Sequence, residues 1–131
     1  MEARKVYSIL LIDDDEDDGL LFENALKEVD KSITCILYND GEKALKDLKS
    51  FTLNPDYIFL DLNMPKMDGF EVLKELKTIK RLWQIPIVVC STTKDKTHIA
   101  KVKTLGAEQF ISKPNSMQEM VHEIRTVLAK T

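Results

Sequence analysis

Short apolar runs alternate with longer amphipathic stretches along the whole chain. The runs are rich in Ile, Val, Leu and Phe and occupy residues 6–12, 33–38, 57–60, 85–90 and 109–111. Runs of this length and composition predict strands that are buried on both faces of a sheet.

The stretches between the runs carry apolar residues at the spacing of an α-helix. They occupy residues 16–29, 41–50, 69–80, 94–105 and 116–130. Asp68 followed by Glu71 forms a capping-box pattern at the start of the third helix, and Gly106 is a suitable stop for the fourth. The first helix is expected to bury one apolar face, made of Leu20, Leu21, Ala25, Leu26 and Val29.

Strictly alternating strands and helices predict an α/β fold. Short parallel strands joined by right-handed helical crossovers give a doubly wound (βα)5 domain, with a five-stranded parallel sheet and helices on both faces. Ligands of such sheets bind beyond the carboxyl ends of the strands, near the point where the strand order reverses. The residues that follow each strand are therefore the candidates for function.

Length, charge and cysteine content narrow the class of protein. The length of 131 residues favours one domain, and the net charge of −3 gives no hint of a basic face for nucleic acid. No apolar stretch approaches the roughly 20 residues of a membrane span, and the apolar run near the N-terminus is too short for a signal peptide. Cys35 and Cys90 lie in apolar runs, so we expect reduced core thiols and a cytoplasmic protein.

Carboxylates, hydroxyls and one ammonium follow four of the five predicted strands. In chain order these residues are Asp13, Asp14, Asp61, Ser91, Thr92, Lys113 and Pro114. The second strand leads into Asn39, Asp40 and Gly41, which indicates an ordinary loop and helix start.

Converging carboxylates repel one another, by roughly 4 kcal/mol for a pair about 4 Å apart at an effective dielectric near 20. A hard cation and a nearby ammonium would offset this repulsion, and an all-oxygen site suits Mg²⁺ (or Mn²⁺). Such a crevice matches phosphoryl transfer to a carboxylate nucleophile. Hydride transfer and acyl hydrolysis match poorly, because His98 and His122 lie away from the strand ends.

The ordered set of strand-end motifs resembles the receiver domain of two-component response regulators. The motifs are Ile12-Asp13-Asp14, Leu60-Asp61-Leu62-Asn63-Met64-Pro65, Met67-Asp68-Gly69, Ser91-Thr92 and Lys113-Pro114. The resemblance covers residues 6–128 and implies a CheY-like, flavodoxin-like fold. It also implies a stand-alone receiver over residues 1–131 without an output domain.

The resemblance assigns roles at the acidic edge. Asp61 resembles the phosphoacceptor that is served by a histidine kinase or phosphotransfer protein. Asp14 resembles the direct Mg²⁺ ligand and Asp13 a ligand largely through water, with Asp61 and the backbone carbonyl of Asn63 completing the protein ligands. Lys113 resembles the lysine that pairs with the phosphoryl group.

The resemblance also implies a switch. Ser91 resembles the hydroxyl residue that moves to the phosphoryl group, and Phe110 occupies the aromatic switch position, although core packing explains Phe110 equally well. Thr92 and Pro114 are supporting residues, Thr92 or Thr93 is expected to cap the fourth helix, and a cis Lys113–Pro114 bond is left open. The surface of the fourth helix, fifth strand and fifth helix is the expected signalling face.

Some neighbouring residues have simpler interpretations. We expect residues 15–18 to cap and solvate the first helix rather than bind metal. Trp83 is expected to cover a helix end, and Pro65 to stiffen its loop.

The leading hypothesis is a phosphorylation-dependent signalling switch with a downstream protein target. Under this hypothesis the protein is not an enzyme in the usual sense and binds neither nucleic acid nor membrane directly. Homodimerisation is left open. The alternatives are a Mg²⁺-dependent phosphohydrolase of the haloacid-dehalogenase type, a flavodoxin-like nucleotide or flavin module, and a degenerate receiver that acts as a binding scaffold. Six consecutive acids from residue 13 argue against the flavodoxin-like module, which needs backbone donors for phosphate there.

Overall fold

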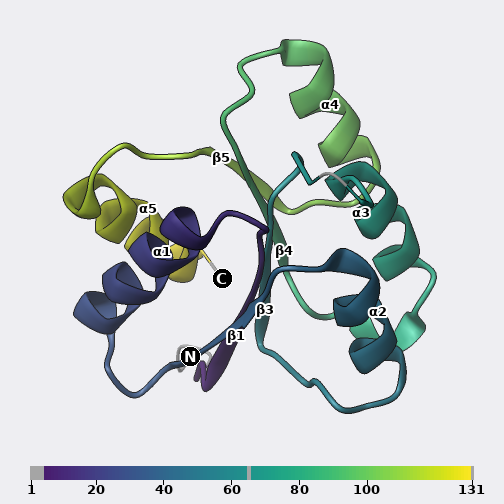
Figure 1. The fold of residues 1–131 in the computed structure, drawn as a ribbon, viewed down its shortest axis with the longest axis horizontal. Helices are drawn as coiled ribbons and strands as arrows, with labels where there is room; N and C mark the ends of the chain where they lie inside the picture. Colours follow the sequence, from purple (N-terminus) through teal and green to yellow (C-terminus); the bar gives the residue numbers. More distant parts are fainter. Residues whose placement is uncertain (1–4, 65, 131) are drawn as a thin grey trace.

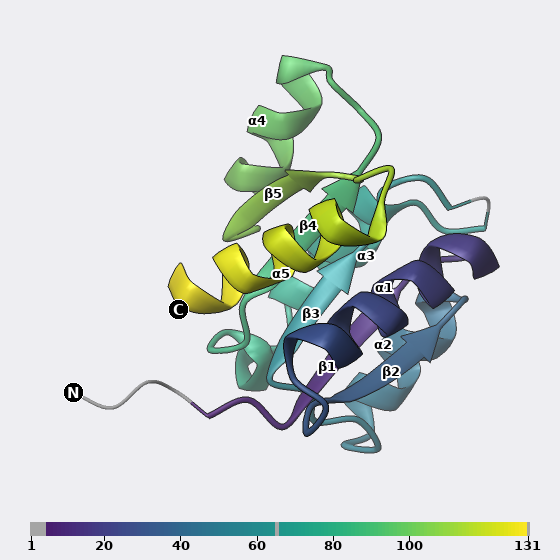
Figure 2. The ribbon, with the colours of Figure 1, turned by 90° about the vertical axis from the view of Figure 1, so that its left-hand side faces the viewer.

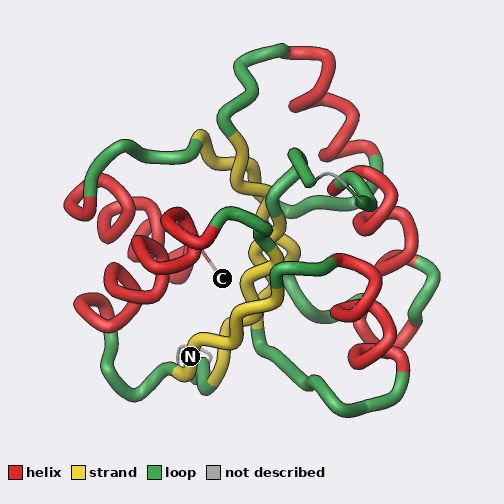
Figure 3. Tube along the Cα trace, in the orientation of Figure 1, coloured by secondary structure: helices red, strands yellow, loops and turns green. Residues whose placement is uncertain are grey.

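Five strands alternate with five α-helices in the computed structural model, which describes residues 5–64 and 66–130. The strands are β1 (Ser8–Ile12), β2 (Thr34–Tyr38), β3 (Tyr57–Leu60), β4 (Ile87–Ser91) and β5 (Gln109–Ser112). The helices are α1 (Glu16–Val29), α2 (Gly41–Lys49), α3 (Gly69–Lys77), α4 (Lys96–Thr104) and α5 (Met117–Lys130), with a 3₁₀ turn at Lys80–Leu82. Figure 3 shows the strands gathered at the centre between two groups of helices.

The five strands form one parallel sheet in the order β2-β1-β3-β4-β5. Helices α1 and α5 lie on one face, and α2, α3 and α4 lie on the other (Figure 1). Figure 2 shows α1 and α5 side by side across the face that they cover. The predicted flavodoxin-like (βα)5 fold is confirmed, and its strand order reverses between β1 and β3.

The edge strands differ from the prediction that all strands are buried on both faces. Strands β3 and β4 are buried throughout, whereas Thr34 and Leu37 of β2, at the edge of the sheet, are exposed. Cys35 is half-buried rather than core, while Cys90 is buried. Burial raises the pKa of both thiols to about 12, so both are neutral at pH 7.

Helix α1 packs with a face that is rotated from the predicted one. Leu20 is 55% exposed, whereas Phe22, which lies outside the predicted face, is buried. The Phe22 ring contacts Phe59 of β3 at a centroid distance of 4.9 Å. The first turn of α1 lies at the carboxyl edge of the sheet, beside the functional candidates, because the helix follows the end of β1 directly.

Capping explains where helices α3 and α4 differ from their predicted bounds. Asp68 accepts the Glu71 N–H at 2.9 Å, which confirms the predicted start of α3. The helix ends at Lys77, where the indole N–H of Trp83 donates to the Lys77 carbonyl at 2.8 Å, so Trp83 does cover a helix end. Helix α4 is capped by Asp95 instead of Thr92 or Thr93, and it ends before Gly106, whose φ is +107°.

Across residues 5–64 and 66–130 the structure contains no helix with the length and apolar character required to cross a membrane. Pro65 lies outside the described residues.

Candidate functional site

The predicted site residues meet at the carboxyl edge of the sheet. Backbone hydrogen bonds continue beyond the strand ends and fix the positions of the loops that follow them. The Asp13 N–H donates to the Tyr38 carbonyl and the Asp61 N–H to the Ile12 carbonyl, each at 3.0 Å. The Lys113 N–H donates to the Ser91 carbonyl at 2.9 Å, so the loops after β4 and β5 are joined in the same way.

Three carboxylates converge at the centre of this edge. Oxygen atoms of Asp13, Asp14 and Asp61 lie within 4.8 Å of one another. Asp61 is 2% exposed, Asp13 is also buried, and Asp14 faces solvent. The Asp61 Oδ1 atom is buried without a hydrogen-bond partner among the described residues. An orphaned buried carboxylate oxygen is costly, and it marks the place where a cation or a reacting group fits.

Lys113 supplies the ammonium that the sequence predicts. Its Nζ atom lies 3.0 Å from Asp13 Oδ2, 3.4 Å from Asp61 Oδ1 and 2.7 Å from Asp18 Oδ2. The third contact corrects the expectation that residues 15–18 only cap and solvate α1. Asp15 does cap the helix by accepting the Asp18 N–H, but the Asp18 carboxylate turns to Lys113.

The contact with Asp18 depends on how α1 sits beside the loop that follows β5. A sequence signal for it exists, because Asp18 lies in the first turn of a helix that starts at the same sheet edge as Lys113. That signal cannot distinguish Asp18 from Asp17, which is exposed.

Burial and charge perturb the proton affinities of the cluster. Burial, and next the charge of Asp13, raise the pKa of Asp61 from 3.8 to about 6, against the opposing effects of Lys113 and the Asn63 N–H. Burial also raises the pKa of Asp13. Burial disfavours the Lys113 ammonium, yet its carboxylate neighbours hold the pKa of Lys113 above its usual value.

Gly69 allows α3 to start directly against the acceptor loop. A Cβ atom at this position would lie 2.5 Å from the Leu62 Cα and would also collide with the Asp61 carbonyl oxygen. The Gly69 N–H donates to the Leu62 carbonyl at 2.9 Å. Glycine is therefore required for the close approach that fixes the backbone of Asp61.

The remaining predicted residues surround the cluster at different depths. Ser91 is fully buried, and its hydroxyl accepts the Thr93 N–H at 3.3 Å, whereas Thr92 is exposed. Phe110 is half-buried against the core that α2, α3 and α4 cover. The described residues include no cis peptide bond, so the Lys113–Pro114 bond is trans.

The donor set fits a hard divalent cation. Three carboxylates supply only oxygen ligands, and one of them has a free buried oxygen. Asn63 is exposed on the loop that follows Asp61, and its backbone carbonyl stays a predicted ligand.

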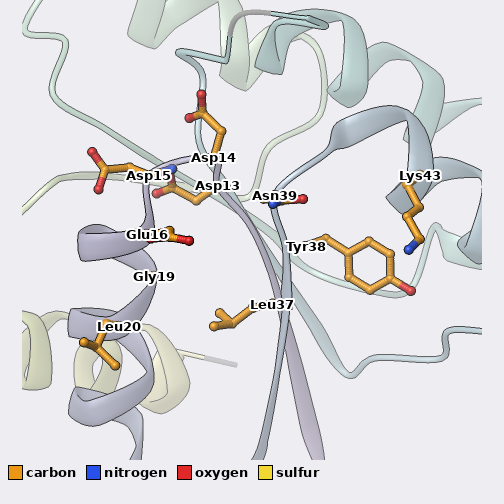
Figure 4. A pocket seen from close by; sticks show the side chains of 10 residues that line it. All are labelled: Asp13, Asp14, Asp15, Glu16, Gly19, Leu20, Leu37, Tyr38, Asn39 and Lys43. Atoms are coloured by element: carbon orange, nitrogen blue, oxygen red, sulfur yellow. The ribbon is translucent and has the colours of Figure 1, made fainter.

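A pocket of about 640 Å³ adjoins the cluster between α1 and β2. Figure 4 shows Asp13, Asp14 and Asp15 on the loop that enters α1, with Leu20 and Leu37 lower on the two elements. Asp13 and Asp14 line this pocket, whereas Asp61 and Lys113 do not, so the pocket adjoins the cluster through two of its three carboxylates.

Curated relatives match most of the chain in sequence. Residues 9–125 match the model of the response regulator receiver domain. The chain is 32% identical to the probable C4-dicarboxylate response regulator DctR of Bacillus subtilis over 118 residues, which are 90% of this chain and 50% of that protein. The chain spans about half the length of the first such relatives, with 50%, 49% and 49% covered.

Solved structures agree with the fold at similar identity. The phosphorylated cyanobacterial phytochrome response regulator RcpA superposes with a TM-score of 0.85 at 30% identity, covering 94% of this chain and 91% of that one. The Mn²⁺-bound form of response regulator Rcp1 superposes with a TM-score of 0.82 at 28% identity, covering 92% of this chain and 91% of that one. These matches do not favour the phosphohydrolase alternative. The fold, the ordered motifs and the family match together show that this chain belongs to the response regulator receiver domain family of two-component systems.

Proposed function

We propose that Asp61 accepts a phosphoryl group from a histidine kinase or a phosphotransfer protein. The observation that carries this proposal is the Asp61 Oδ1 atom, which is buried, without a hydrogen bond, and 3.4 Å from the Lys113 ammonium. An oxygen in this position combines a free lone pair with a neighbouring positive charge. Both are needed by a carboxylate that attacks a phosphorus atom whose oxygens are anionic.

In the transfer step a bond forms between an Asp61 carboxylate oxygen and phosphorus while the phosphorus–nitrogen bond of the donor phosphohistidine breaks. The imidazole leaves with the electron pair of that bond and takes up a proton. Lys113 neutralises part of the charge on the phosphoryl oxygens. The product is an acyl phosphate on Asp61, and a later attack by water on phosphorus breaks the bond to the carboxylate oxygen, releases inorganic phosphate and returns the carboxylate.

Mg²⁺ is the cation that we propose, held by Asp13, Asp14, Asp61 and the backbone carbonyl of Asn63, and Mn²⁺ suits the same oxygens. When bound, the cation supplies positive charge for the phosphoryl oxygens and offsets the repulsion among the carboxylates. The chain's own part is to hold three carboxylates within 4.8 Å at the end of a rigid sheet.

The response to phosphorylation would pass through Ser91 and Phe110. The Ser91 hydroxyl is buried and accepts one hydrogen bond from its own loop, so it has a donor to offer to a phosphoryl oxygen. Movement of Ser91 would allow the half-buried Phe110 ring to turn inward and would alter the surface formed by α4, β5 and α5. Phosphorylation then shifts a population between two forms of that surface.

This proposal makes the chain a cytoplasmic switch rather than a catalyst for an external substrate. Its partners would be a phosphodonor protein and a downstream protein that reads the α4–β5–α5 surface.

Phosphorylation by a small donor tests the proposal directly. Incubation with acetyl phosphate and Mg²⁺ is expected to add one phosphoryl group to the chain, detected by intact-mass measurement and mapped to Asp61. Chelation of the metal with EDTA is expected to prevent labelling, because the carboxylates then repel the anionic donor. Equal labelling in EDTA, or a label on another residue, would contradict the assignment.

A further inference from the structure

The ammonium of Lys113 lies nearer to helix α1 than to the acceptor. Its Nζ atom is 2.7 Å from Asp18 Oδ2 and 3.0 Å from Asp13 Oδ2, within the usual range of a charge-assisted hydrogen bond. The distance to Asp61 Oδ1 is 3.4 Å, and that oxygen has no hydrogen bond. The ammonium therefore donates its N–H bonds to Asp13 and Asp18 rather than to Asp61.

We propose that Asp18 is a positioning residue that holds the Lys113 ammonium back from Asp61, and that Lys113 leaves Asp18 when Asp61 carries a phosphoryl group. This inference rests on the function proposed above. It assigns a role to a side chain on α1 that lies outside the strand-end motifs.

The two carboxylates that hold Lys113 differ in their freedom to release it. The Asp13 side chain is 4% exposed, and its Oδ1 atom accepts the Asp15 N–H at 3.0 Å, so water cannot replace the ammonium there. The Asp18 side chain is 41% exposed, and water can solvate it as soon as Lys113 departs. The exchange of Lys113 from Asp18 to a phosphoryl oxygen therefore costs little, and Asp18 is the partner that is released.

The same contact joins two elements that are distant in sequence. Asp18 lies in the first turn of α1, and Lys113 lies in the loop between β5 and α5. Release of Lys113 would break a link between α1 and this loop at the moment of phosphorylation. The signal would then reach α1 as well as the α4–β5–α5 surface.

Substitution of Asp18 separates this role from a general effect of charge. In Asp18→Asn the outer carboxylate is lost, Lys113 is free to move toward Asp61, and labelling by acetyl phosphate with Mg²⁺ is expected to become about two- to five-fold faster, the effect of one partly exposed charge pair. Asp17→Asn is the matched control, since it removes one exposed carboxylate from the same turn without touching Lys113. Asp18→Glu restores the carboxylate and is expected to return the rate to within about two-fold of the original chain.

A second measurement observes the pair without phosphorylation. The ¹⁵N and ¹H signals of the Lys113 ammonium in the unmodified chain are expected to shift, and its exchange with water to accelerate, in Asp18→Asn but not in Asp17→Asn. Equal labelling rates for these two variants, slower labelling of Asp18→Asn than of the original chain, or an unchanged Lys113 signal would each overturn the positioning role. Failure of the unsubstituted chain to become labelled would overturn the proposed function instead, and the release of Lys113 with it, whatever the ammonium signal shows.

Discussion

Replacement of Asp61 with asparagine is expected to abolish labelling by acetyl phosphate and at the same time to stabilise the unmodified chain at pH 7. The amide lacks the nucleophilic oxygen that forms the acyl phosphate. The substitution also removes one of two neighbouring buried negative charges. Burial, and next the charge of Asp13, raise the pKa of Asp61, so the ionised carboxylate is unfavourable at this site. Asp61 would therefore be a residue that is needed for function and that lowers the stability of the unmodified chain.

The sign of the pH dependence follows from the raised pKa. Asp61 has a pKa of about 6 in the folded chain and 3.8 as its ordinary value, so between these pH values the folded chain binds more protons than the unfolded one. The free energy of unfolding then falls as the pH rises from about 4 to about 7. The difference between the two pKa values of Asp61 corresponds to about 3 kcal/mol in the free energy of unfolding. Since the amide is still a buried polar group, we expect a gain of about 1–2 kcal/mol for Asp61→Asn at pH 7.5.

Urea unfolding in EDTA measures this gain without any contribution from a bound cation. The difference between Asp61→Asn and the original chain is expected to be large at pH 7.5 and close to zero at pH 4.5. Asp17→Asn serves as the control for an exposed carboxylate and should change stability little at either pH. A gain for Asp61→Asn that is the same at both pH values would show that shape, and not charge, is responsible.

Replacement of Gly69 with alanine is expected to destabilise the chain by about 2–3 kcal/mol, through overpacking against backbone. The added Cβ would lie 2.5 Å from the Leu62 Cα and against the Asp61 carbonyl oxygen, and neither neighbour is the flexible end of a side chain. Helix α3 or the acceptor loop must shift. Because that loop carries Asp61, labelling should slow as well.

Gly19 offers a matched comparison within the same fold. It also lies in the first half of a helix and is buried, but a Cβ there would meet the Leu37 side chain at 3.9 Å, an ordinary contact. Gly19→Ala is therefore expected to stabilise the chain by about 0.5–1 kcal/mol through helix propensity. Thermal or urea unfolding of the two variants measures both effects. Similar losses in the two variants would refute the argument from close backbone approach.

The acidic edge could be predicted because a local pattern determines it. Apolar runs place the strand ends, and parallel strands bring all of their carboxyl ends to one edge, so Asp13, Asp61 and Lys113 had to meet there. The start of α3 could be predicted for the same reason, since Asp68 and Glu71 act within a single turn. The five motifs that follow the strands, in this order along the chain, then suffice to suggest the family.

The missed features depend on contacts between distant elements. The exposure of Leu37 on β2 follows from the strand order, which no local pattern contains. The exposure of Leu20 follows from the rotation of α1 that buries Phe22 against Phe59. The pairing of Asp18 with Lys113 requires both that rotation and the position of the loop after β5.

Trp83 has a consequence for how the chain can be observed. It is the single tryptophan of the sequence, and it precedes the start of β4, whereas the acidic cluster follows the ends of the strands. Its indole is bonded to the Lys77 carbonyl at the end of α3 and is 57% exposed. Tryptophan emission therefore originates at the opposite rim of the sheet, and a bound cation would not quench it by contact. Any change in emission on phosphorylation would report motion transmitted along the length of the strands.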